Sequence, residues 1–166
     1  MITNGFAAAQ AEESISFTLD TPAEEAFPLF GPKREMDWDP NWRPIFLAPA
    51  DGDQTERGSV FVVRAEDRES VWIMTEYDVA HRAVQYVRVT PGHTTGQIWI
   101  SITPLTAARS QVKVRYRLTG LSPIGNRFVK KWALEFPAKG SDWAEVLNHY
   151  LRTGKALLSK VYDVQE

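Results

Sequence analysis

Apolar and polar residues alternate along much of this chain, and the alternation predicts a mainly antiparallel sheet. The first strand, at residues 14–19, places Ile15, Phe17 and Leu19 on one face, as expected of a strand with one face buried. Turn-forming clusters such as Pro91-Gly92 separate the later strand-like runs. Six such runs are expected, at residues 43–48, 58–65, 70–77, 82–90, 95–103 and 110–119.

Two short helices are expected between the first strand and the second. Thr21 is a candidate N-cap for a helix that begins at Pro22 and ends at Phe30. A second helix is expected over residues 33–38, and Asp39-Pro40 ends it.

Helical patterning returns after the last strand. Ser122-Pro123 predicts a helix start, and the pattern is interrupted at residues 137–140. Asp142 and Glu145 have the spacing of a capping box for a last helix, whose apolar residues recur as far as Val161. This order of elements predicts an α+β fold, in which a curved antiparallel sheet of about seven strands wraps around a long C-terminal helix.

The length of 166 residues suits one domain. We expect residues 1–13 to form a flexible arm and residues 14–161 to form a single domain of this kind.

Hairpin geometry predicts which side chains face the helix. Loops at residues 78–81 and 91–94 would bring mostly apolar side chains together on one face, because a strand register fixes the facing of every residue. The expected neighbours are Trp72 and Val87, Met74 and Gln85, Glu76 and Ala83, Val87 and Ile98, Gln85 and Ile100, Ile98 and Tyr116, Ile100 and Val114, and Ile102 and Val112, with Val63 and Phe61 beside Trp72 and Met74.

The opposite face is expected to be polar, with one aromatic exception. Tyr86 and Trp99 would pair there near Arg88. Such a pair is either a cross-strand stabilising contact with an arginine stacked on it, or a contact surface for a protein partner or a homodimer. The other residues expected on this face are Gln97, Lys113, Arg115 and Arg117.

Three polar residues fall among the inward positions. Glu76 and Gln85 either anchor a polar group of a ligand or lie at the sheet rim, where Glu76 reaches water. Tyr116 is expected to be a core residue whose hydroxyl finds a partner.

Composition narrows the classes of function. The chain has six Trp, five Tyr and eight Phe, which suit a ligand pocket as well as a core. A net charge of -2 without a basic block argues against a nucleic-acid partner. No apolar run approaches the ~20 residues of a membrane span, and residues 1–13 lack the features of a signal peptide.

Few residues of the sequence suggest a catalytic, metal-binding or phosphate-binding site. The absence of cysteine excludes disulfides and thiolate sites and fits a cytoplasmic location. The three histidines lack metal-ligand spacing, and neither a Gly-x-Ser-x-Gly motif nor a glycine-rich phosphate loop is present. We therefore expect no metal and no cofactor.

The chain resembles the SRPBCC superfamily, also called START-like or helix-grip, in its polyketide cyclase/dehydrase-like branch. The resemblance covers about residues 14–160 and rests on the topology and on four local segments. These are Thr21-Pro22-Ala23-Glu24-Glu25-Ala26-Phe27, Trp38-Asp39-Pro40 through Trp42, Gly58-Ser59-Val60-Phe61 and Glu76-Tyr77-Asp78.

The resemblance implies a cavity between the sheet and the final helix, used in the superfamily for lipids, sterols, polyketides and other hydrophobic molecules. Members include aromatase/cyclases, carriers and a branch that stimulates a chaperone's ATPase. Residues 122–136 depart from the simplest version, and either lengthen the helix or cover the pocket.

Our leading hypothesis is a binding or carrier protein for a hydrophobic small molecule, such as a lipid or a polyketide. The first alternative is a cyclase/dehydratase-like enzyme, with Glu76 as acid or base and Tyr116 or Gln85 holding an enolate oxygen. The second is a protein-interaction module whose cavity its own side chains fill. The residues expected at the ligand are Trp38, Trp42, Phe61, Val63, Trp72, Met74, Glu76, Gln85, Val87, Ile98, Ile100, Val114, Tyr116, Trp143, Leu147 and Tyr150.

Overall fold

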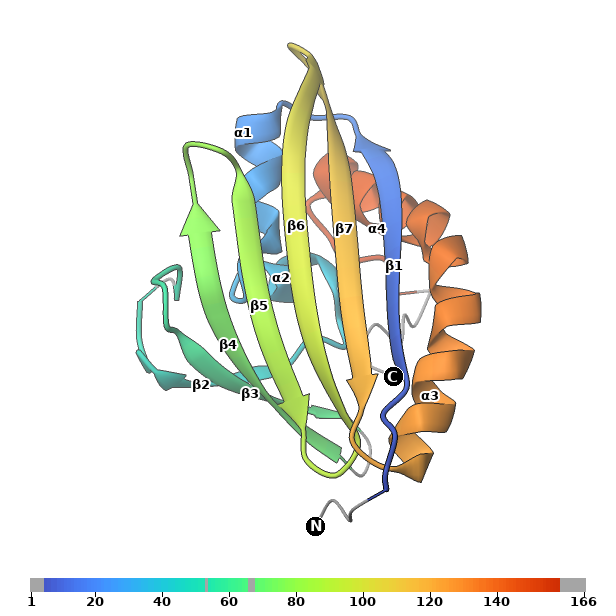
Figure 1. The fold of residues 1–166 in the computed structure, drawn as a ribbon. Coiled ribbons are helices and arrows are strands. Elements are labelled where there is room, and N and C mark those ends of the chain that lie inside the picture. The colour runs from blue at the N-terminus through green and yellow to red at the C-terminus, as the bar shows by residue number, and fades with distance from the viewer. Residues whose placement is uncertain (1–4, 53, 66–67, 159–166) are drawn as a thin grey trace.

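A seven-stranded antiparallel sheet forms the body of the protein (Figure 1). The computed structural model describes residues 5–52, 54–65 and 68–158. The strand order is β1-β7-β6-β5-β4-β3-β2, so that β1 and β2 form the edges. The strands are β1 (Gln10–Leu19), β2 (Pro44–Ala48), β3 (Val60–Ala65), β4 (Arg68–Asp78), β5 (Ala83–Thr90), β6 (Thr94–Thr106) and β7 (Arg109–Gly120).

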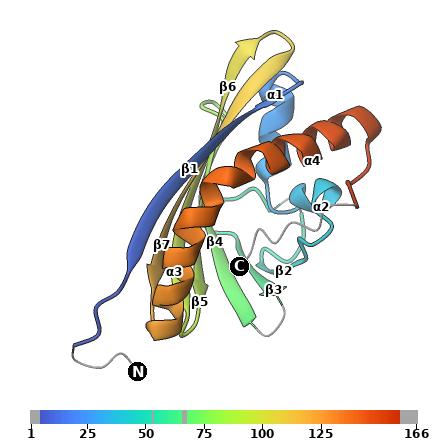
Figure 2. The same ribbon diagram turned by 90° about the vertical axis from the view of Figure 1, so that its right-hand side faces the viewer.

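All the helices lie on one side of the curved sheet (Figure 2). Those that follow β1 are α1 (Ala23–Ala26), the 3-10 helix η1 (Phe27–Phe30) and α2 (Glu35–Trp38). Those that follow β7 are α3 (Pro123–Glu135), the 3-10 helix η2 (Phe136–Lys139) and α4 (Gly140–Thr153). The expected α+β helix-grip architecture is confirmed.

The C-terminal helical region is bent at the place where the sequence pattern breaks. The 3-10 turn η2, which contains Pro137, separates α3 from α4. Residues 122–136 form a separate helix that packs against β1 and β7. The helix α4 ends at Thr153 because Gly154 adopts a left-handed conformation with φ 67°. The expected continuation of this helix was therefore wrong beyond Thr153, and Val161 lies outside the described residues.

Of the three helix caps that the sequence predicted, the structure confirms one. The Ser122 hydroxyl accepts a hydrogen bond from the Gly125 N–H at 3.1 Å and caps α3 as predicted. Thr21 does not cap α1, because its hydroxyl donates to the Glu25 carboxylate at 2.8 Å. The capping box was also wrong: η2 leads into α4 in helical conformation, which leaves Asp142 inside the helix.

The sheet begins earlier along the chain than the alternation suggested. β1 starts at Gln10 rather than at residue 14 and pairs with β7 from Thr119 onward. The Ala9 N–H also donates to Asn126 Oδ1 of α3 at 2.7 Å. Part of the segment expected to be an arm is therefore hydrogen-bonded to the sheet.

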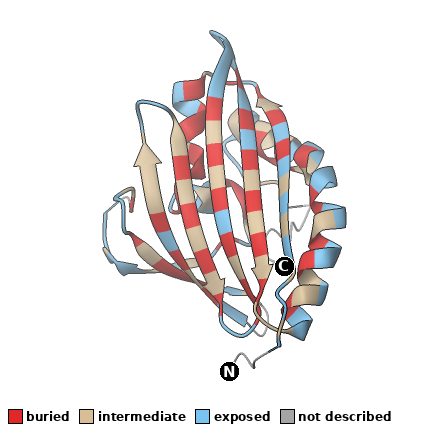
Figure 3. Ribbon diagram, in the orientation of Figure 1, coloured by how far each residue is buried: buried red, intermediate tan, exposed pale blue. Residues whose placement is uncertain are grey.

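Buried and less buried residues alternate along the central strands, as Figure 3 shows for β5, β6 and β7. The predicted register between β6 and β7 is confirmed. Its pairs are Ile98 with Tyr116, Ile100 with Val114, and Ile102 with Val112.

The predicted facing of β5 was wrong. Two local features cause the inversion: β4 has a bulge between Met74 and Glu76, and the turn after β5 is shorter than expected, because Thr90 pairs with Thr94. One extra residue on one strand reverses the facing of everything beyond it. The observed pairs are Trp72 with Arg88, Met74 with Tyr86, Glu76 with Gln85, Tyr86 with Ile98, and Val84 with Ile100.

The inversion moves four residues to unexpected faces. Tyr86 and Arg88, each 3% exposed, lie on the inner face, whereas Gln85 and Val87 lie on the outer face. The β3 register is shifted by two residues and keeps its facing: Phe61 pairs with Trp72.

The outer face holds Trp99 without Tyr86. The Arg115 guanidinium stacks on the Trp99 ring at 4.0 Å, and Arg117 lies 5.6 Å from it. Glu12 of β1 accepts hydrogen bonds from both arginines. The predicted Tyr86–Trp99 pair with Arg88 stacked on it was therefore wrong, since Arg115 and Arg117 cover the Trp99 ring instead. A homodimer contact at Trp99 stays a prediction.

Candidate ligand pocket

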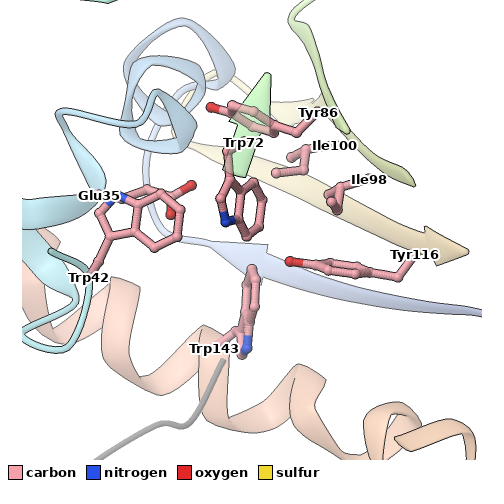
Figure 4. Close-up of a pocket in the computed structure, with 8 residues that line it drawn as sticks. All are labelled: Glu35, Trp42, Trp72, Tyr86, Ile98, Ile100, Tyr116 and Trp143. Carbon is pink, nitrogen blue, oxygen red and sulfur yellow. The ribbon is translucent and has the colours of Figure 1, made fainter. Parts of the chain in front are cut away.

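A small pocket lies between the inner face of the sheet and the helices (Figure 4). The space open to the centre of a water-sized sphere is about 20 Å³, which is enough for roughly one water molecule. This pocket is therefore too small for the hydrophobic molecules that the resemblance implied. The lining residues are Glu35, Trp42, Trp72, Tyr86, Ile98, Ile100, Tyr116 and Trp143.

The sheet supplies most of the wall. Tyr86, Ile98 and Tyr116 are cross-strand neighbours in one row over β5, β6 and β7. Since alternate residues share a face, Ile100 follows Ile98 on the inner side. The Trp72 ring stands edge-on to Tyr86, with ring centroids 5.9 Å apart.

The segment from α2 to β2 closes one side of the pocket. The Trp42 indole N–H donates to the Pro32 carbonyl at 2.7 Å, and the Trp38 indole donates to the Leu29 carbonyl at 2.8 Å. Both bonds anchor the rings to the backbone around η1. Trp42 stands edge-on to Trp72 at 5.3 Å and so completes the aromatic wall.

Trp143 of α4 closes the pocket from the helix side. Its ring centroid lies 6.1 Å from Phe17 of β1 and 6.2 Å from Trp38. The side chain is 6% exposed. Trp143 is thus the only contribution of α4 to the pocket lining in the described part of the chain.

Glu35 is the carboxyl group of the pocket. Although the residue is only partly buried, its carboxyl end points toward the rings (Figure 4). Burial raises the pKa of Glu35 well above its usual range, and the nearby Asp39 carboxylate raises it further. Glu35 thus has the environment of a carboxyl that holds its proton to higher pH than a surface glutamate does.

The two pocket tyrosines have different roles. The Tyr86 hydroxyl donates to the Phe30 carbonyl at 2.7 Å. The Tyr116 hydroxyl points toward the space between Trp72 and Trp143 (Figure 4). Burial raises the pKa of both phenols, so both are neutral hydrogen-bonding groups near neutral pH. The Tyr116 hydroxyl is the one that faces the pocket.

Two buried hydrogen-bond donors on the inner face have no acceptor within the described residues. One is the Trp72 indole Nε1, and the other is Nε of Arg88. The Arg88 guanidinium carbon lies 5.7 Å from the Trp72 ring centroid. Burial lowers the pKa of Arg88, while Tyr116 acts in the opposite direction; arginine remains protonated in either case.

The structure brings together six of the residues expected at the ligand. Trp42, Trp72, Ile98, Ile100, Tyr116 and Trp143 line the pocket. Others are buried in the core beyond the pocket lining: Trp38, Phe61, Val63, Met74, Val114 and Leu147. Tyr150 is partly buried against this core.

Glu76, Gln85 and Val87 are not part of the pocket lining. Gln85 Nε2 donates to Glu76 Oε2, and both are partly exposed. Beyond the β4 bulge it is Tyr77 that packs inward, against Phe27 at 4.7 Å between ring centroids. The prediction that Glu76 and Gln85 face inward was therefore wrong.

Sequence reasoning missed Glu35, Tyr86 and Arg88. Tyr86 and Arg88 were assigned to the outer face because the bulge has no marker in the sequence. Nothing in the sequence marked Glu35 as a pocket residue, since only packing of α2 against the rest of the chain brings it there.

Neither a metal-binding cluster nor a helix that could span a membrane is found within residues 5–52, 54–65 and 68–158. No three His, Asp or Glu side chains there are grouped to hold a metal ion. No helix within those ranges has both the length and the apolar character needed to cross a membrane.

Sequence comparisons give no match, either to a protein-family model or to a curated protein. Solved structures match over most of the chain. A START superfamily protein from Mycobacterium smegmatis is 18% identical, with a TM-score of 0.64 over 87% of this chain and 99% of that one.

Two other matches are enzymes by their descriptions. Norcoclaurine synthase from Thalictrum flavum, in complex with dopamine and hydroxybenzaldehyde, is 12% identical, with a TM-score of 0.61 over 95% of this chain and 98% of that one. The di-domain ARO/CYC BexL from the BE-7585A biosynthetic pathway is 18% identical, with a TM-score of 0.60 over 87% of this chain and 46% of that one. The sheet order, the bent C-terminal helices and these likenesses together show that the chain has the helix-grip fold, which it shares with the START superfamily protein and with norcoclaurine synthase.

Proposed function

We propose that the protein binds a small aromatic molecule in the pocket between the sheet and α4. The observation that carries this proposal is the composition of the wall, in which five aromatic rings from five separate segments converge with two isoleucines on one space. Pockets for small molecules are mostly apolar and carry a few polar groups that orient the ligand. Here Glu35, the Tyr116 hydroxyl and the Trp72 indole N–H are those groups.

The helix-grip neighbours support the same class of ligand. Norcoclaurine synthase is described with dopamine and hydroxybenzaldehyde bound, and both are single-ring aromatic compounds. The similarity to this chain is one of fold, so it supports a ligand class and names no ligand.

Binding requires the pocket to open, because about 20 Å³ does not hold a ring. Burying an aromatic body of about 150–250 Å² contributes about 4–6 kcal/mol. Displacing wall side chains and immobilising the ligand offset part of that gain. We therefore expect dissociation constants in the micromolar range for a simple aromatic probe.

The test uses N-phenylnaphthylamine as a neutral aromatic probe and follows the indole N–H signals in a nitrogen–proton NMR spectrum. We expect saturable shifts of the signals of Trp42, Trp72 and Trp143, because these rings line the pocket. Trp99 is the internal control, since its ring lies on the outer face beneath Arg115. Single Trp→Phe variants assign the signals.

Unshifted pocket signals at saturating probe, or a shift of Trp99 alone, would contradict the proposal. The second of these results would favour binding through the outer surface.

The second candidate function is catalysis of proton transfer, and Glu35 is the specific observation that favours it. A carboxyl whose pKa is raised by burial is suited to general acid–base catalysis near neutral pH. It lies in an aromatic pocket with the Tyr116 hydroxyl, which can donate to a developing oxyanion. In this alternative Glu35 takes the role that the sequence suggested for Glu76.

A nitrobenzisoxazole measures this reactivity without knowledge of the natural substrate. A carboxylate removes the ring C–H proton, the N–O bond breaks, and a coloured cyanophenolate forms. We expect the protein-catalysed rate to rise with pH through the raised pKa of Glu35, because only the ionised carboxylate accepts the proton. Glu35→Gln should lower that rate by about tenfold or more.

Glu76→Gln is the matched control and should leave the rate unchanged, because Glu76 lies outside the pocket lining. Equal rates for wild type and Glu35→Gln would remove the enzymatic candidate, whereas a loss in Glu76→Gln alone would restore the original assignment.

A further inference from the structure

Arg88 is a charged side chain in the interior of the protein. It lies on the inner face of β5, two residues after Tyr86, and is 3% exposed. Its cross-strand neighbours are Trp72 on one side and Gly96 on the other. Arg88 thus belongs to the row of the sheet next to the one that holds Tyr86, Ile98 and Tyr116.

No carboxylate in the described part of the chain balances this charge. Within the described residues no carboxylate acts on Arg88 electrostatically, and its Nε is buried without an acceptor. Six arginines nearer the surface behave differently, because they pair with aspartate or glutamate: Arg34, Arg64, Arg82, Arg109, Arg115 and Arg117. A buried charge without a partner is costly in a folded protein, so its presence at this position calls for a partner.

The fold makes room for the Arg88 side chain. A Cβ placed on Gly96 would lie 3.0 Å from Arg88 Cγ and 3.1 Å from Arg88 Nε. The Arg88 side chain therefore passes over β6 at Gly96, which has no side chain to block it. Its far end is near the pocket wall, since the guanidinium carbon lies 5.7 Å from the centroid of the Trp72 ring.

A second donor points to the same chemistry. The Trp72 indole Nε1 is buried and has no acceptor among the described residues, and Trp72 lines the pocket. Two adjacent residues thus present N–H groups that lack oxygen partners. Guanidinium is the side chain that best matches a carboxylate, because its N–H groups can donate two parallel hydrogen bonds.

We propose that the ligand of this pocket is an organic acid, whose apolar body lies among the rings while its anionic group pairs with Arg88. The indole N–H of Trp72 is a second donor to that group or to an oxygen beside it. This inference rests on the proposed binding function and names the chemical class of its ligand. A neutral molecule would fill the apolar space and leave the Arg88 charge unpaired.

The test compares naphthoic acid with its methyl ester, which differ in charge and share the ring system. Each displaces N-phenylnaphthylamine from the protein in a fluorescence titration at a pH where the acid is ionised. We expect the wild type to bind the acid about tenfold or more tightly than the ester, as hydrogen bonds to charged groups imply. In Arg88→Met the preference should vanish, while the ester keeps its affinity within about twofold.

Arg115→Met is the matched control, because it removes the same charge from the outer face. This variant should keep the preference for the acid. The ligand-free melting temperature gives a second measurement: Arg88→Met should melt at or above the wild-type temperature, since the variant no longer buries an unpaired charge. A clear fall in the melting temperature of Arg88→Met would mean that Arg88 has a structural partner, and would overturn the inference.

The outcomes separate the two proposals. If the ester and the probe bind with shifts of the pocket indoles but the acid has no advantage, the organic-acid inference fails and the binding function stands. The inference also fails if Arg88→Met keeps the preference. If naphthoic acid, its methyl ester and the probe all fail to bind the wild type, both proposals are wrong.

Discussion

Replacing Gly125 with alanine is expected to lower the stability of the protein by about 3 kcal/mol or more, in the range of severe overpacking. A Cβ at this position would overlap the His93 carbonyl oxygen and lie 2.9 Å from the carbonyl carbon. The obstacle is backbone, and that carbonyl also accepts a hydrogen bond from the Leu121 N–H at 2.8 Å. Moving α3 away would break this bond and separate the helix start from the β5–β6 turn.

The direction of this effect is informative because helix propensity predicts the opposite. Gly125 lies in the first turn of α3, where alanine is intrinsically better than glycine by about 1 kcal/mol. We expect the melting temperature, measured by tryptophan fluorescence or circular dichroism, to fall by roughly 10 °C.

Gly140→Ala is the matched control for Gly125→Ala. Gly140 is also helical, and a Cβ there would meet its nearest atom at 3.5 Å, an ordinary contact. This variant should be as stable as the wild type or slightly more stable. Unchanged stability of Gly125→Ala would show that α3 does not pack against the β5–β6 turn in this way.

Replacing Trp143 with alanine should have two opposite effects, on stability and on binding. Trp143 is 6% exposed and packs on Phe17 and Trp38, so its truncation should cost about 3–5 kcal/mol. The same change enlarges the pocket by the volume of an indole ring. Because the ring no longer has to be displaced, we expect N-phenylnaphthylamine to bind the variant more tightly than the wild type and to raise its melting temperature by more.

Trp99→Ala is the control for this variant. It removes the same side chain from the outer face, where the loss of the Arg115 stacking contact is worth about 0.5–1 kcal/mol. Probe binding should not change. If Trp143→Ala loses stability without any gain in probe binding, Trp143 is an ordinary core residue and the ligand site lies elsewhere.

Both the binding function and the organic-acid inference depend on a pocket that is nearly closed in this structure. The second alternative from the sequence, an interaction module with a filled cavity, agrees with the small volume. It loses half of its proposed surface, however, because Tyr86 is buried and hydrogen-bonded to Phe30. The titration of the pocket indoles distinguishes these hypotheses directly.

Local pattern determined the elements of this protein and much of their arrangement. The alternation predicted the seven strands, the cap at Ser122 was confirmed, and the break at Pro137 separated two helices. The register of β6 and β7 was also predictable, since both strands carry a continuous apolar pattern and a one-residue slip would turn the apolar side chains of one strand outward.

Tertiary structure alone decided the facing of β5 and the contents of the pocket. The bulge in β4 has no signature in the residues around Thr75, yet it exchanges Gln85 for Tyr86 and Val87 for Arg88 on the inner face. Glu35 reaches the pocket only because the chain from η1 to β2 folds back over the sheet.

The physical reason is how far apart in the sequence the residues lie whose contacts determine each feature. Whether a residue belongs to a strand or a helix depends on neighbours within a few positions, and these are visible in the sequence. The register at a bulge, the path of a connecting segment and the remaining volume between sheet and helix depend on contacts between distant residues. For this chain, those contacts placed a carboxyl and two phenols around one small space, with the buried Arg88 guanidinium next to the Trp72 ring of its wall.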